Sequence, residues 1–392
     1  MRLLHVVPTY IPAWRRGGPI RSVHGLAKAL VERGHEVTVF TTDVDCEGRV
    51  PTDRPVPLDG VAVRYFPVRF PRRLYHSPAM RQALSTEMRR FDVVHLHSVF
   101  LWPTLAAARA AERAGVPYVV SPRGMLVREL LQRRGRLRKA AWLRLFERRT
   151  LARAAALHAT SELEADELRC LGLTLPPIAV VPNGVGTPEE TGNVPASVAG
   201  KPYFLFLGRL SWKKGLDRLV RALPGVPDAS LAVAGPDEEG TRARIGYLAR
   251  ELGLTDRIDF LGEVHGGEKA ALLRHAVALV LPSYSENFGN VVLEAMAAGR
   301  PVVVTPAVGL AEVVRREGAG LVVEGDPEPL AAALNQLLRA PQSADAMGQR
   351  GARAARRLFG WDTIARETEG LYDRIRRGGD AKLPSAGEGR HL

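Results

Sequence analysis

The sequence predicts an α/β protein of two domains, each built on a parallel β-sheet. Short apolar runs rich in Val, Ile and Leu alternate with helical segments along most of the 392 residues, and buried parallel strands have this composition. The chain is too long for one ordinary domain and suits two of about 180 residues. Residues 186–202, rich in Gly, Pro, Thr and Ser without periodicity, are expected to link them.

The first domain is expected over residues 1–190, and it opens with a β-α-β unit. A strand is expected at 3–10, followed by a helix that ends at Gly34. Gly17 and Gly18 precede this helix, but they do not form the G-x-G-x-x-G fingerprint, so nothing indicates a nicotinamide or flavin cofactor. Later strands are expected at 61–66, 92–98, 117–124, 156–161 and 178–185.

The second domain is expected over residues 201–358 and repeats the alternation. Its strands are expected at 203–210 and 230–236 and in the runs RIDFLGEV, LVLPS, PVVVTP and LVVEG. An amphipathic helix is expected over residues 359–377, and the polar tail 378–392 is expected to be disordered. Because ligands of parallel sheets bind beyond the carboxyl ends of strands, the candidates in the first domain are His97, Arg123, Gly124, Ser161, Glu162 and Asn183.

The net charge of +13 is concentrated in the first half of the chain. Residues 128–153 contain ten basic and two acidic side chains in a helical, amphipathic pattern. Such a segment favours binding to an anionic membrane surface, and the alternative is an Arg-rich face that only packs on the sheet. Nucleic acid is the least favoured partner, since no recognised binding motif accompanies the charge.

Other features of the composition argue for a cytoplasmic protein without a disulfide framework. No apolar run approaches the length of about 18–20 residues that a membrane span needs. The N-terminus is expected to form a strand and not a signal peptide. Cys46 and Cys170 are too few for a disulfide framework and match no metal-site spacing, so a reducing compartment is expected.

The stretch 283–305, SYSENFGNVVLEAMAAGRPVVVT, carries the strongest functional pattern. Gly289 and Asn290 open a helix whose free N–H groups and positive dipole end favour an anion such as phosphate. Glu286 precedes this helix and Glu294 lies eight residues later inside it, where a carboxylate suits a sugar hydroxyl. A phosphate beside a polyol is the description of a sugar nucleotide.

This stretch resembles the signature of glycosyltransferase family 4, the retaining enzymes of GT-B fold. The resemblance includes the Glu-x7-Glu spacing, Phe288 and the run GRPVV, and it extends over nearly the whole chain. It implies two Rossmann-like domains that face each other across a cleft, with the acceptor on the first and the sugar nucleotide on the second. It also implies that the helix over 359–377 crosses back onto the first domain.

The family pattern assigns roles to individual residues. Arg209 and Lys214 in GRLSWKKG match the Arg-x4-Lys pair that neutralises the donor diphosphate, so no metal ion is expected. Glu286 would face the donor sugar, and Glu294 would bind the ribose. The remaining expected donor contacts are Gly17, Gly18, Asn183, Gly235, Gly262, Glu263, Val264, Phe288, Gly289 and Asn290.

Arg123 departs from the family pattern. Many relatives carry His-Gly after this strand, whereas this chain has SPRG. An Arg cannot act as a base near neutral pH, but it can hold a phosphate or carboxylate through two parallel hydrogen bonds. The substitution argues against a His-assisted step and suggests a charged group on a substrate. His97 is the candidate for acceptor contact.

The resemblance and the motifs together predict a retaining glycosyltransferase that moves a sugar from a nucleotide donor to an acceptor hydroxyl. Polysaccharide or glycolipid assembly, at the inner face of the membrane, would suit the Arg-rich segment. Two alternatives remain open. One is another enzyme of the same fold, such as an epimerase or phosphorylase, and the other is a non-catalytic protein that binds sugar nucleotides or nucleic acid.

Overall fold

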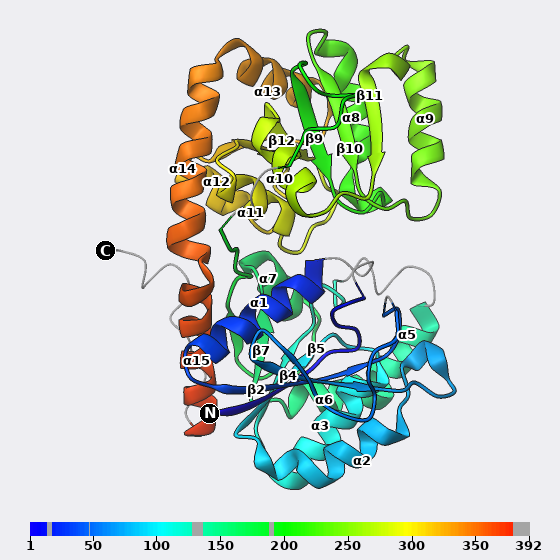
Figure 1. The fold of residues 1–392 in the computed structure, drawn as a ribbon, viewed down its shortest axis with the longest axis vertical. Coiled ribbons are helices and arrows are strands. Elements are labelled where there is room, and N and C mark those ends of the chain that lie inside the picture. The colour runs from blue at the N-terminus through cyan, green and yellow to red at the C-terminus, as the bar shows by residue number, and fades with distance from the viewer. Residues whose placement is uncertain (14–17, 47, 128–135, 188–191, 379–392) are drawn as a thin grey trace. The chain divides into compact units, whose positions relative to one another are not determined.

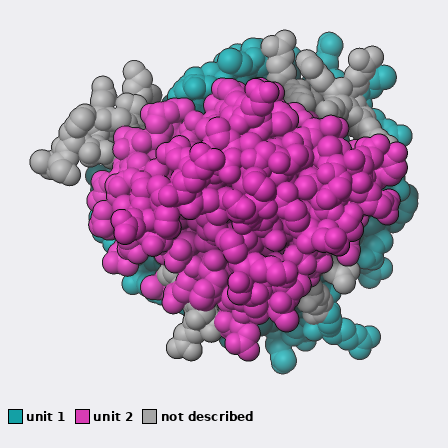
Figure 2. Space-filling model, turned by 90° about the horizontal axis from the view of Figure 1, so that it is seen from above, with its two compact units in different colours: residues 1–184, 361–392 teal, residues 185–360 magenta. Residues whose placement is uncertain are grey.

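A computed structural model of the chain describes residues 1–13, 18–46, 48–127, 136–187 and 192–378. The chain divides into two compact units (Figure 2). Unit 1 comprises residues 1–184 and 361–392, and unit 2 comprises residues 185–360. The division therefore falls just before the expected linker, and residues 186–202 belong to unit 2. The expected disordered tail lies, apart from Gly378, outside the described residues.

Unit 1 is built on an eight-stranded sheet in the order β3-β4-β2-β1-β5-β6-β7-β8. Figure 1 labels β2, β4, β5 and β7 of this sheet. Its strands are β1 Arg2–Val6, β2 Glu36–Thr42, β3 Val56–Leu58, β4 Val61–Phe66, β5 Val93–His97, β6 Tyr118–Ser121, β7 Ala156–Ala159 and β8 Ile178–Val180. All neighbours are parallel except β3 and β4, which are antiparallel. The short β3 was not expected from the sequence, because VPL lacks a β-branched run.

Helices cover both faces of this sheet, so alternate residues of each strand enter different cores. The helices are α1 Gly18–Glu32, α2 Pro78–Glu87, α3 Trp102–Ala114, α5 Arg136–Trp142, α6 Arg148–Ala152, α7 Glu162–Arg169 and α15 Trp361–Arg376. One core joins the sheet to α2, α3, α6 and α7. The other joins it to α1 and α15, and a polar layer described below lies on this second face.

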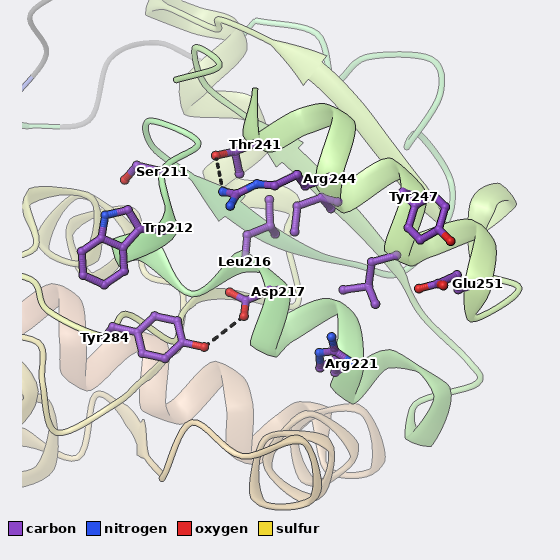
Figure 3. Close-up of a pocket in the computed structure, with 12 residues that line it drawn as sticks. Ser211, Trp212, Leu216, Asp217, Arg221, Thr241, Arg244, Tyr247, Glu251 and Tyr284 are labelled. Atoms are coloured by element: carbon purple, nitrogen blue, oxygen red, sulfur yellow. Dashed lines mark hydrogen bonds between the residues drawn. The ribbon is translucent and has the colours of Figure 1, made fainter. Parts of the chain in front are cut away.

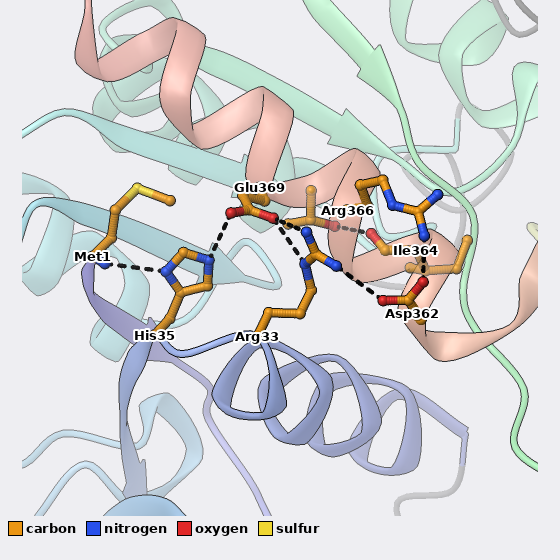
Figure 4. Close-up of polar contacts among 8 residues, drawn as sticks. Met1, Arg33, His35, Asp362, Ile364, Arg366 and Glu369 are labelled. Carbon is orange, nitrogen blue, oxygen red and sulfur yellow. Dashed lines mark hydrogen bonds and ion pairs between the residues drawn. The ribbon is translucent and has the colours of Figure 1, made fainter.

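The C-terminal helix α15 belongs to unit 1, although it follows unit 2 in the sequence. Besides its apolar face, charged side chains fix it to the end of α1 (Figure 4). Arg33 contacts Glu369 at 2.6 Å and Asp362 at 2.9 Å. His35 lies 3.3 Å from Glu369, and the amino group of Met1 lies 3.1 Å from the His35 Nδ1. These contacts hold the pKa of Glu369 below its ordinary value, chiefly through the hydrogen bond from Arg33.

Unit 2 is built on a six-stranded parallel sheet in the order β11-β10-β9-β12-β13-β14. Its strands are β9 Tyr203–Leu207, β10 Ser230–Ala234, β11 Ile258–Gly262, β12 Ala278–Leu281, β13 Val302–Val304 and β14 Gly320–Val322. Its helices are α8 Leu216–Ala222, α9 Thr241–Glu251, α10 Gly266–His275, α11 Asn290–Ala297, α12 Ala311–Glu317, α13 Pro327–Arg339 and α14 Pro341–Phe359. The strand order reverses between β9 and β12, and ligands of such sheets bind at this reversal.

Candidate functional site

The loops that follow β9 and β12 meet at the strand-order reversal of unit 2. Lys214, from the turn before α8, forms an ion pair with Glu286, from the loop before α11. Each of these side chains is only 17% exposed. The loops are also joined by a backbone hydrogen bond, in which the Tyr284 N–H donates to the Lys213 carbonyl at 2.7 Å. The sequence places Lys214 and Glu286 in a common site, and they do lie together.

Glycines stand at the carboxyl ends of three neighbouring strands, Gly208 after β9, Gly235 after β10 and Gly262 at the end of β11. The Gly208 N–H donates to the Ala234 carbonyl at 2.9 Å, and the Gly235 N–H donates to the Gly262 carbonyl at 2.6 Å. Gly235 has a φ of 139°, and a Cβ on it would lie 2.0 Å from the Gly208 oxygen. Only glycine fits there. The result is an edge formed by bare backbone, which a phosphate or nucleoside can approach closely.

The segment between β12 and α11 is fixed by its own backbone and by Phe288. Glu286 donates its N–H to the Ala307 carbonyl at 3.0 Å, and its carbonyl accepts from Gly309 at 2.9 Å. Phe288 is 4% exposed and its ring packs against Phe359. Gly289 has a φ of 96°, and a Cβ there would lie 3.1 Å from Val308. Asn290 then begins α11, so the N–H groups of this helix lie next to Glu286.

Glu294 forms an ion pair with a lysine that the sequence analysis did not identify. The Lys269 Nζ lies 2.6 Å from the Glu294 Oε2, and the two side chains are 18% and 28% exposed. Lys269 comes from the first turns of α10. No local motif marks it, because the contact joins residues 25 positions apart in the sequence, on two helices separated by β12. The carboxylate expected to bind ribose hydroxyls therefore lies beside a cation.

Arg209 also has a partner that was not predicted. Its guanidinium lies 2.9 Å from the Glu238 carboxylate, and both side chains are about half exposed. The expectation was that Arg209 and Lys214 point toward one anionic group. In this structure they contact different carboxylates, so convergence on a diphosphate requires Arg209 to leave Glu238.

Two expected nucleobase contacts differ in exposure. The Val264 side chain is 6% exposed and belongs to the hydrophobic core of unit 2. Glu263 is exposed and lies 3.6 Å from His265. A nucleobase could contact Val264 mainly through its backbone.

In unit 1, Arg123 follows β6 and is held by neutral partners. Its Nη1 donates to the Asn183 Oδ1 at 2.7 Å and to the Ser22 Oγ at 3.4 Å, and its Nη2 donates to the His97 Nδ1 at 3.2 Å. His97 is 1% exposed, so its ring lies beneath the guanidinium. The structure thus brings together three predicted residues, Arg123, Asn183 and His97. Gly18 begins α1, whereas Gly17 lies outside the described residues.

The partner of His97 fixes its tautomer. A guanidinium only donates hydrogen bonds, so the His97 Nδ1 must accept and its Nε2 must carry the proton. That Nε2 lies 3.0 Å from the His5 Nδ1, which accepts in turn. Burial lowers the pKa of His5 to about 3 and lowers that of His97 well below its ordinary value, with the Arg123 charge acting in the same direction.

A second chain of bonds fixes two further histidines on the same face of the sheet. The Val181 carbonyl accepts from the His158 Nε2 at 2.7 Å, so the His158 Nδ1 accepts from the His95 Nε2 at 3.2 Å. The Tyr372 hydroxyl then donates to the His95 Nδ1 at 2.6 Å. Burial lowers the pKa of both rings, that of His158 to about 3.

Within the described part of the chain, His5, His95 and His97 have nitrogens close enough together to hold a metal ion. The hydrogen-bond network argues against that use. Both ring nitrogens of His95 and of His97 are engaged with protein partners, and the partner of the His97 Nδ1 is the Arg123 guanidinium. A metal would have to displace these bonds beside a guanidinium cation. The cluster fits a neutral scaffold under Arg123 better than it fits a metal site.

A separate groove of about 400 Å³ lies between α8 and α9 in unit 2 (Figure 3). Trp212 and Tyr284 stand at one end, and the Tyr284 hydroxyl lies 3.0 Å from the Asp217 carboxylate. These two aromatic residues come from the loops that carry Lys214 and Glu286. The sequence analysis did not identify this groove, whose polar and apolar side chains are scattered over two helices.

The Arg-rich segment is described from residue 136 onward, and residues 128–135 lie outside the described part. It forms α5, a π-helical turn over Leu143–Glu147, and α6. Leu137 and Leu145 are 77% and 68% exposed. Glu147 is buried and accepts hydrogen bonds from the Trp142 indole and the Phe100 N–H. Leu137 and Leu145 are therefore exposed, whereas Leu143 and Leu151 of the same segment pack in the core of unit 1.

Comparison with known proteins identifies the family. Residues 17–184 match a glycosyl transferase 4-like domain, and residues 189–354 match the domain of glycosyl transferases group 1. A D-inositol 3-phosphate glycosyltransferase of Xylanimonas cellulosilytica is 31% identical over 385 residues, which cover 91% of each chain. This chain belongs to the group 1 glycosyltransferases. The recognition of the family from the Glu-x7-Glu stretch is thereby confirmed.

Solved glycosyltransferase structures confirm the GT-B fold. Sucrose-phosphate synthase of Thermosynechococcus elongatus superposes with a TM-score of 0.78 at 22% identity, over 96% of this chain and 100% of that one. The Anabaena protein HepE, solved with UDP and glucose, superposes with a TM-score of 0.73 at 21% identity, over 95% and 99% of the two chains. Membership of the family favours a glycosyltransferase over the epimerase, phosphorylase and binding-protein alternatives.

Among the described residues, no helix combines the length and the apolar character required to cross a membrane.

Proposed function

We propose that this glycosyltransferase is a retaining enzyme that uses a nucleoside-diphosphate sugar as donor. The observation that carries the proposal is the pairing of cation and carboxylate at the strand-order reversal of unit 2, Lys214 with Glu286 and Lys269 with Glu294. A sugar nucleotide supplies both complements, since its phosphates suit the cations and its hydroxyls suit the carboxylates. The complex of HepE with UDP and glucose supports this class of donor.

In the proposed reaction, the bond from the sugar C1 to the diphosphate oxygen breaks as the acceptor oxygen attacks C1 from the same face. The acceptor proton passes to the departing phosphate oxygen, so the protein need not supply a nucleophile. The leaving diphosphate gains negative charge as the bond breaks. Lys214 pairs with Glu286 in the loop before α11, and Arg209 lies in the same loop after β9 as Lys214. These two cations and the N–H groups of α11 can stabilise that charge once Arg209 leaves Glu238.

The same argument leads us to propose that the reaction needs no metal ion. Each fixed cation is already held by a carboxylate, Lys214 by Glu286 and Arg209 by Glu238. An entering diphosphate would exchange one anionic partner for another, without a large reorganisation of charge. Under this proposal, turnover is unchanged when divalent ions are removed with EDTA.

We further propose that the enzyme works at the inner face of the cell membrane, on acceptors of polysaccharide or glycolipid assembly. Leu137 and Leu145 are exposed on a surface that also exposes Arg138, Arg144 and Arg148. Exposed leucines among arginines suit an anionic bilayer surface, where each basic side chain contributes about 1 kcal/mol.

The test of the donor proposal is a screen of UDP-, GDP- and ADP-sugars by thermal shift and by release of the nucleotide. A ligand at a hundred times its dissociation constant stabilises the protein by about 2.7 kcal/mol. The proposal expects one nucleotide series to stabilise the enzyme and to be hydrolysed slowly without acceptor. Retention is tested by determining the anomeric configuration of the product by NMR. Stabilisation by none of the series, or an inverted product, contradicts the proposal.

A further inference from the structure

Arg123 carries a positive charge that forms no ion pair with any carboxylate of the described residues. Its hydrogen-bond partners are an amide oxygen, a hydroxyl and a neutral imidazole. Among the described residues, no carboxylate lies within ion-pair distance of its guanidinium. The neighbouring carboxylate of Glu164 is already engaged, by the Gly124 N–H at 2.7 Å and by the N–H and hydroxyl of Thr160 at 2.7 and 2.9 Å.

Burial in unit 1 disfavours the charged form of Arg123. The rings of His5, His95, His97 and His158 lie beneath it, and their hydrogen bonds fix all four as neutral tautomers. A cation removed from water without a counter-charge is strongly unfavourable. Burial accordingly lowers the pKa of Arg123 to about 10, although the nearby Glu164 charge acts in the opposite direction. The arrangement lacks an anion in direct contact with the guanidinium.

Two of the five N–H groups of Arg123 are also unused within the described residues. Nη1 makes two bonds and Nη2 makes one, which leaves one Nη2 hydrogen and the buried Nε–H. The residue as a whole is partly exposed, although its Nε is buried. A planar fork with free donors is the geometry that holds a carboxylate or phosphate.

The backbone conformation of Arg123 is energetically unfavourable for a residue other than glycine. Arg123 has a φ of 55°, in the left-handed region that non-glycine residues rarely adopt. Such conformations persist where the surrounding structure enforces them, and they concentrate at functional sites. Arg123 also contacts Ser22 of α1, whose first turn contains no acidic residue, so the positive end of this helix adds to the local potential.

We propose that Arg123 is the centre of a binding site for an oxyanion, a phosphate or carboxylate group carried by a substrate. The assignment of this group to a substrate rests on the proposed function. The binding of an oxyanion by Arg123 is independent of it. The neutral histidines and Asn183 act as positioning residues that hold the guanidinium. Two substrates can supply the oxyanion, the donor through its diphosphate or an acceptor that carries a negative charge.

The experiment measures the affinity of the full chain for inorganic phosphate, by titration calorimetry at constant ionic strength. The variants are Arg123→Gln, which removes the charge, and Arg123→Lys, which keeps the charge but not the fork. Arg89→Gln is the matched control, because it removes an exposed arginine from the same unit. Loss of one charge-assisted partner is expected to weaken phosphate binding about 10- to 100-fold in Arg123→Gln, by less in Arg123→Lys, and not at all in Arg89→Gln.

A circular dichroism spectrum and an urea titration of each variant establish that it is folded. If Arg123→Gln does not fold, Arg123→Lys decides the matter, since it must bind phosphate more weakly than the wild type. Equal affinity of the wild type and the folded Arg123 variant for phosphate overturns the proposal. The proposal is also overturned if the wild type binds no phosphate at any concentration at which it remains folded.

Two further arms identify the source of the oxyanion. If saturating UDP abolishes phosphate binding and Arg123→Gln weakens UDP, the site holds the donor diphosphate. If phosphate still binds beside UDP, and glucose 6-phosphate but not glucose competes with it, the site holds an anionic acceptor. Failure of UDP to bind at all would count against the proposed donor site in unit 2, while Arg123-dependent binding of phosphate would still support this inference.

Discussion

Acidification should destabilise unit 1 selectively, because its sheet buries four histidines in the neutral form. His5, His95, His97 and His158 are at most 2% exposed, and burial lowers the pKa of each. A histidine whose folded pKa is depressed contributes stability that is fully present above its unfolded pKa of about 6.5. That stability is lost as the pH falls below this value, because the histidines are then protonated in the unfolded chain but remain neutral in the folded chain.

The magnitude follows from the linkage relation. Between pH 7.5 and 5.5, each ring that stays neutral in the fold and has an unfolded pKa of about 6.5 loses about 1.4 kcal/mol of stabilisation. Four such rings lose about 5–6 kcal/mol, which is comparable to the whole stability of a typical domain. His35 acts in the same direction, because burial lowers its pKa. Glu147 acts in the opposite direction, because burial raises its pKa.

The assay is hydrogen exchange followed by mass spectrometry at the two pH values, corrected for the intrinsic exchange rates. Protection of β5 in unit 1 should fall steeply at pH 5.5. Unit 2 provides the internal control, since its two histidines, His265 and His275, are exposed. Protection of β12 should therefore change little. In His5→Gln, whose amide oxygen can still accept from His97, the loss should shrink by about 1.4 kcal/mol. Equal protection of β5 at both pH values would refute the reasoning.

Three other predictions concern packing, membrane binding and metal dependence. Gly235→Ala should destabilise unit 2 by about 2 kcal/mol or more, because its Cβ would lie 2.0 Å from the Gly208 oxygen at a φ of 139°. Gly246→Ala, within α9 and with open space around it, should instead stabilise by about 0.5–1 kcal/mol, and urea denaturation measures both; equal effects would count against the backbone argument. Leu145→Asp should weaken binding to phosphatidylglycerol vesicles about tenfold or more, as measured by vesicle sedimentation. The control is Phe70→Asp, which changes an exposed aromatic residue outside the Arg-rich segment and should leave binding unchanged. Unchanged sedimentation of Leu145→Asp would contradict membrane binding by the Arg-rich segment. Nucleotide release should be the same with EDTA as with magnesium, and a loss of turnover with EDTA would show that Lys214 and Arg209 do not suffice.

The fold could be predicted from the sequence because its signals are local. Apolar runs such as VAVRYF need no distant partner to be recognised as buried strands, and this run forms β4 over its whole length. The expected strands are all present, although most are shorter, since polar residues at their ends turn out to lie in loops. The short antiparallel β3 was missed because it depends on pairing with β4 and not on its own composition.

The candidate site was predictable only where a contiguous motif carries it. Glu286 and Glu294 share one stretch, and Lys214 follows a strand that resembles the family pattern. Lys269 and Glu238 were not predicted, although each forms an ion pair with a predicted residue, Glu294 and Arg209 respectively. They come from α10 and from the loop before α9, outside any contiguous motif. The histidine layer was visible only as the alternation of His95 and His97. Its connection to His5 and His158 arises from strand order, and its connection to Tyr372 from the packing of α15 on the sheet; a local sequence pattern shows neither.

The central claim is that the loops after β9 and β12, together with α11, form the site of a sugar nucleotide. The most direct test is the affinity of UDP, GDP and ADP for the wild type, for Glu294→Gln and for Glu312→Gln, measured by titration calorimetry. Glu294 contacts Lys269 at 2.6 Å, whereas Glu312 is an exposed carboxylate on α12 that contacts Arg315. The account predicts that one nucleotide binds the wild type and Glu312→Gln equally, and binds Glu294→Gln about 10- to 100-fold more weakly. Equal affinity in all three proteins, or no binding of any nucleotide, would contradict it.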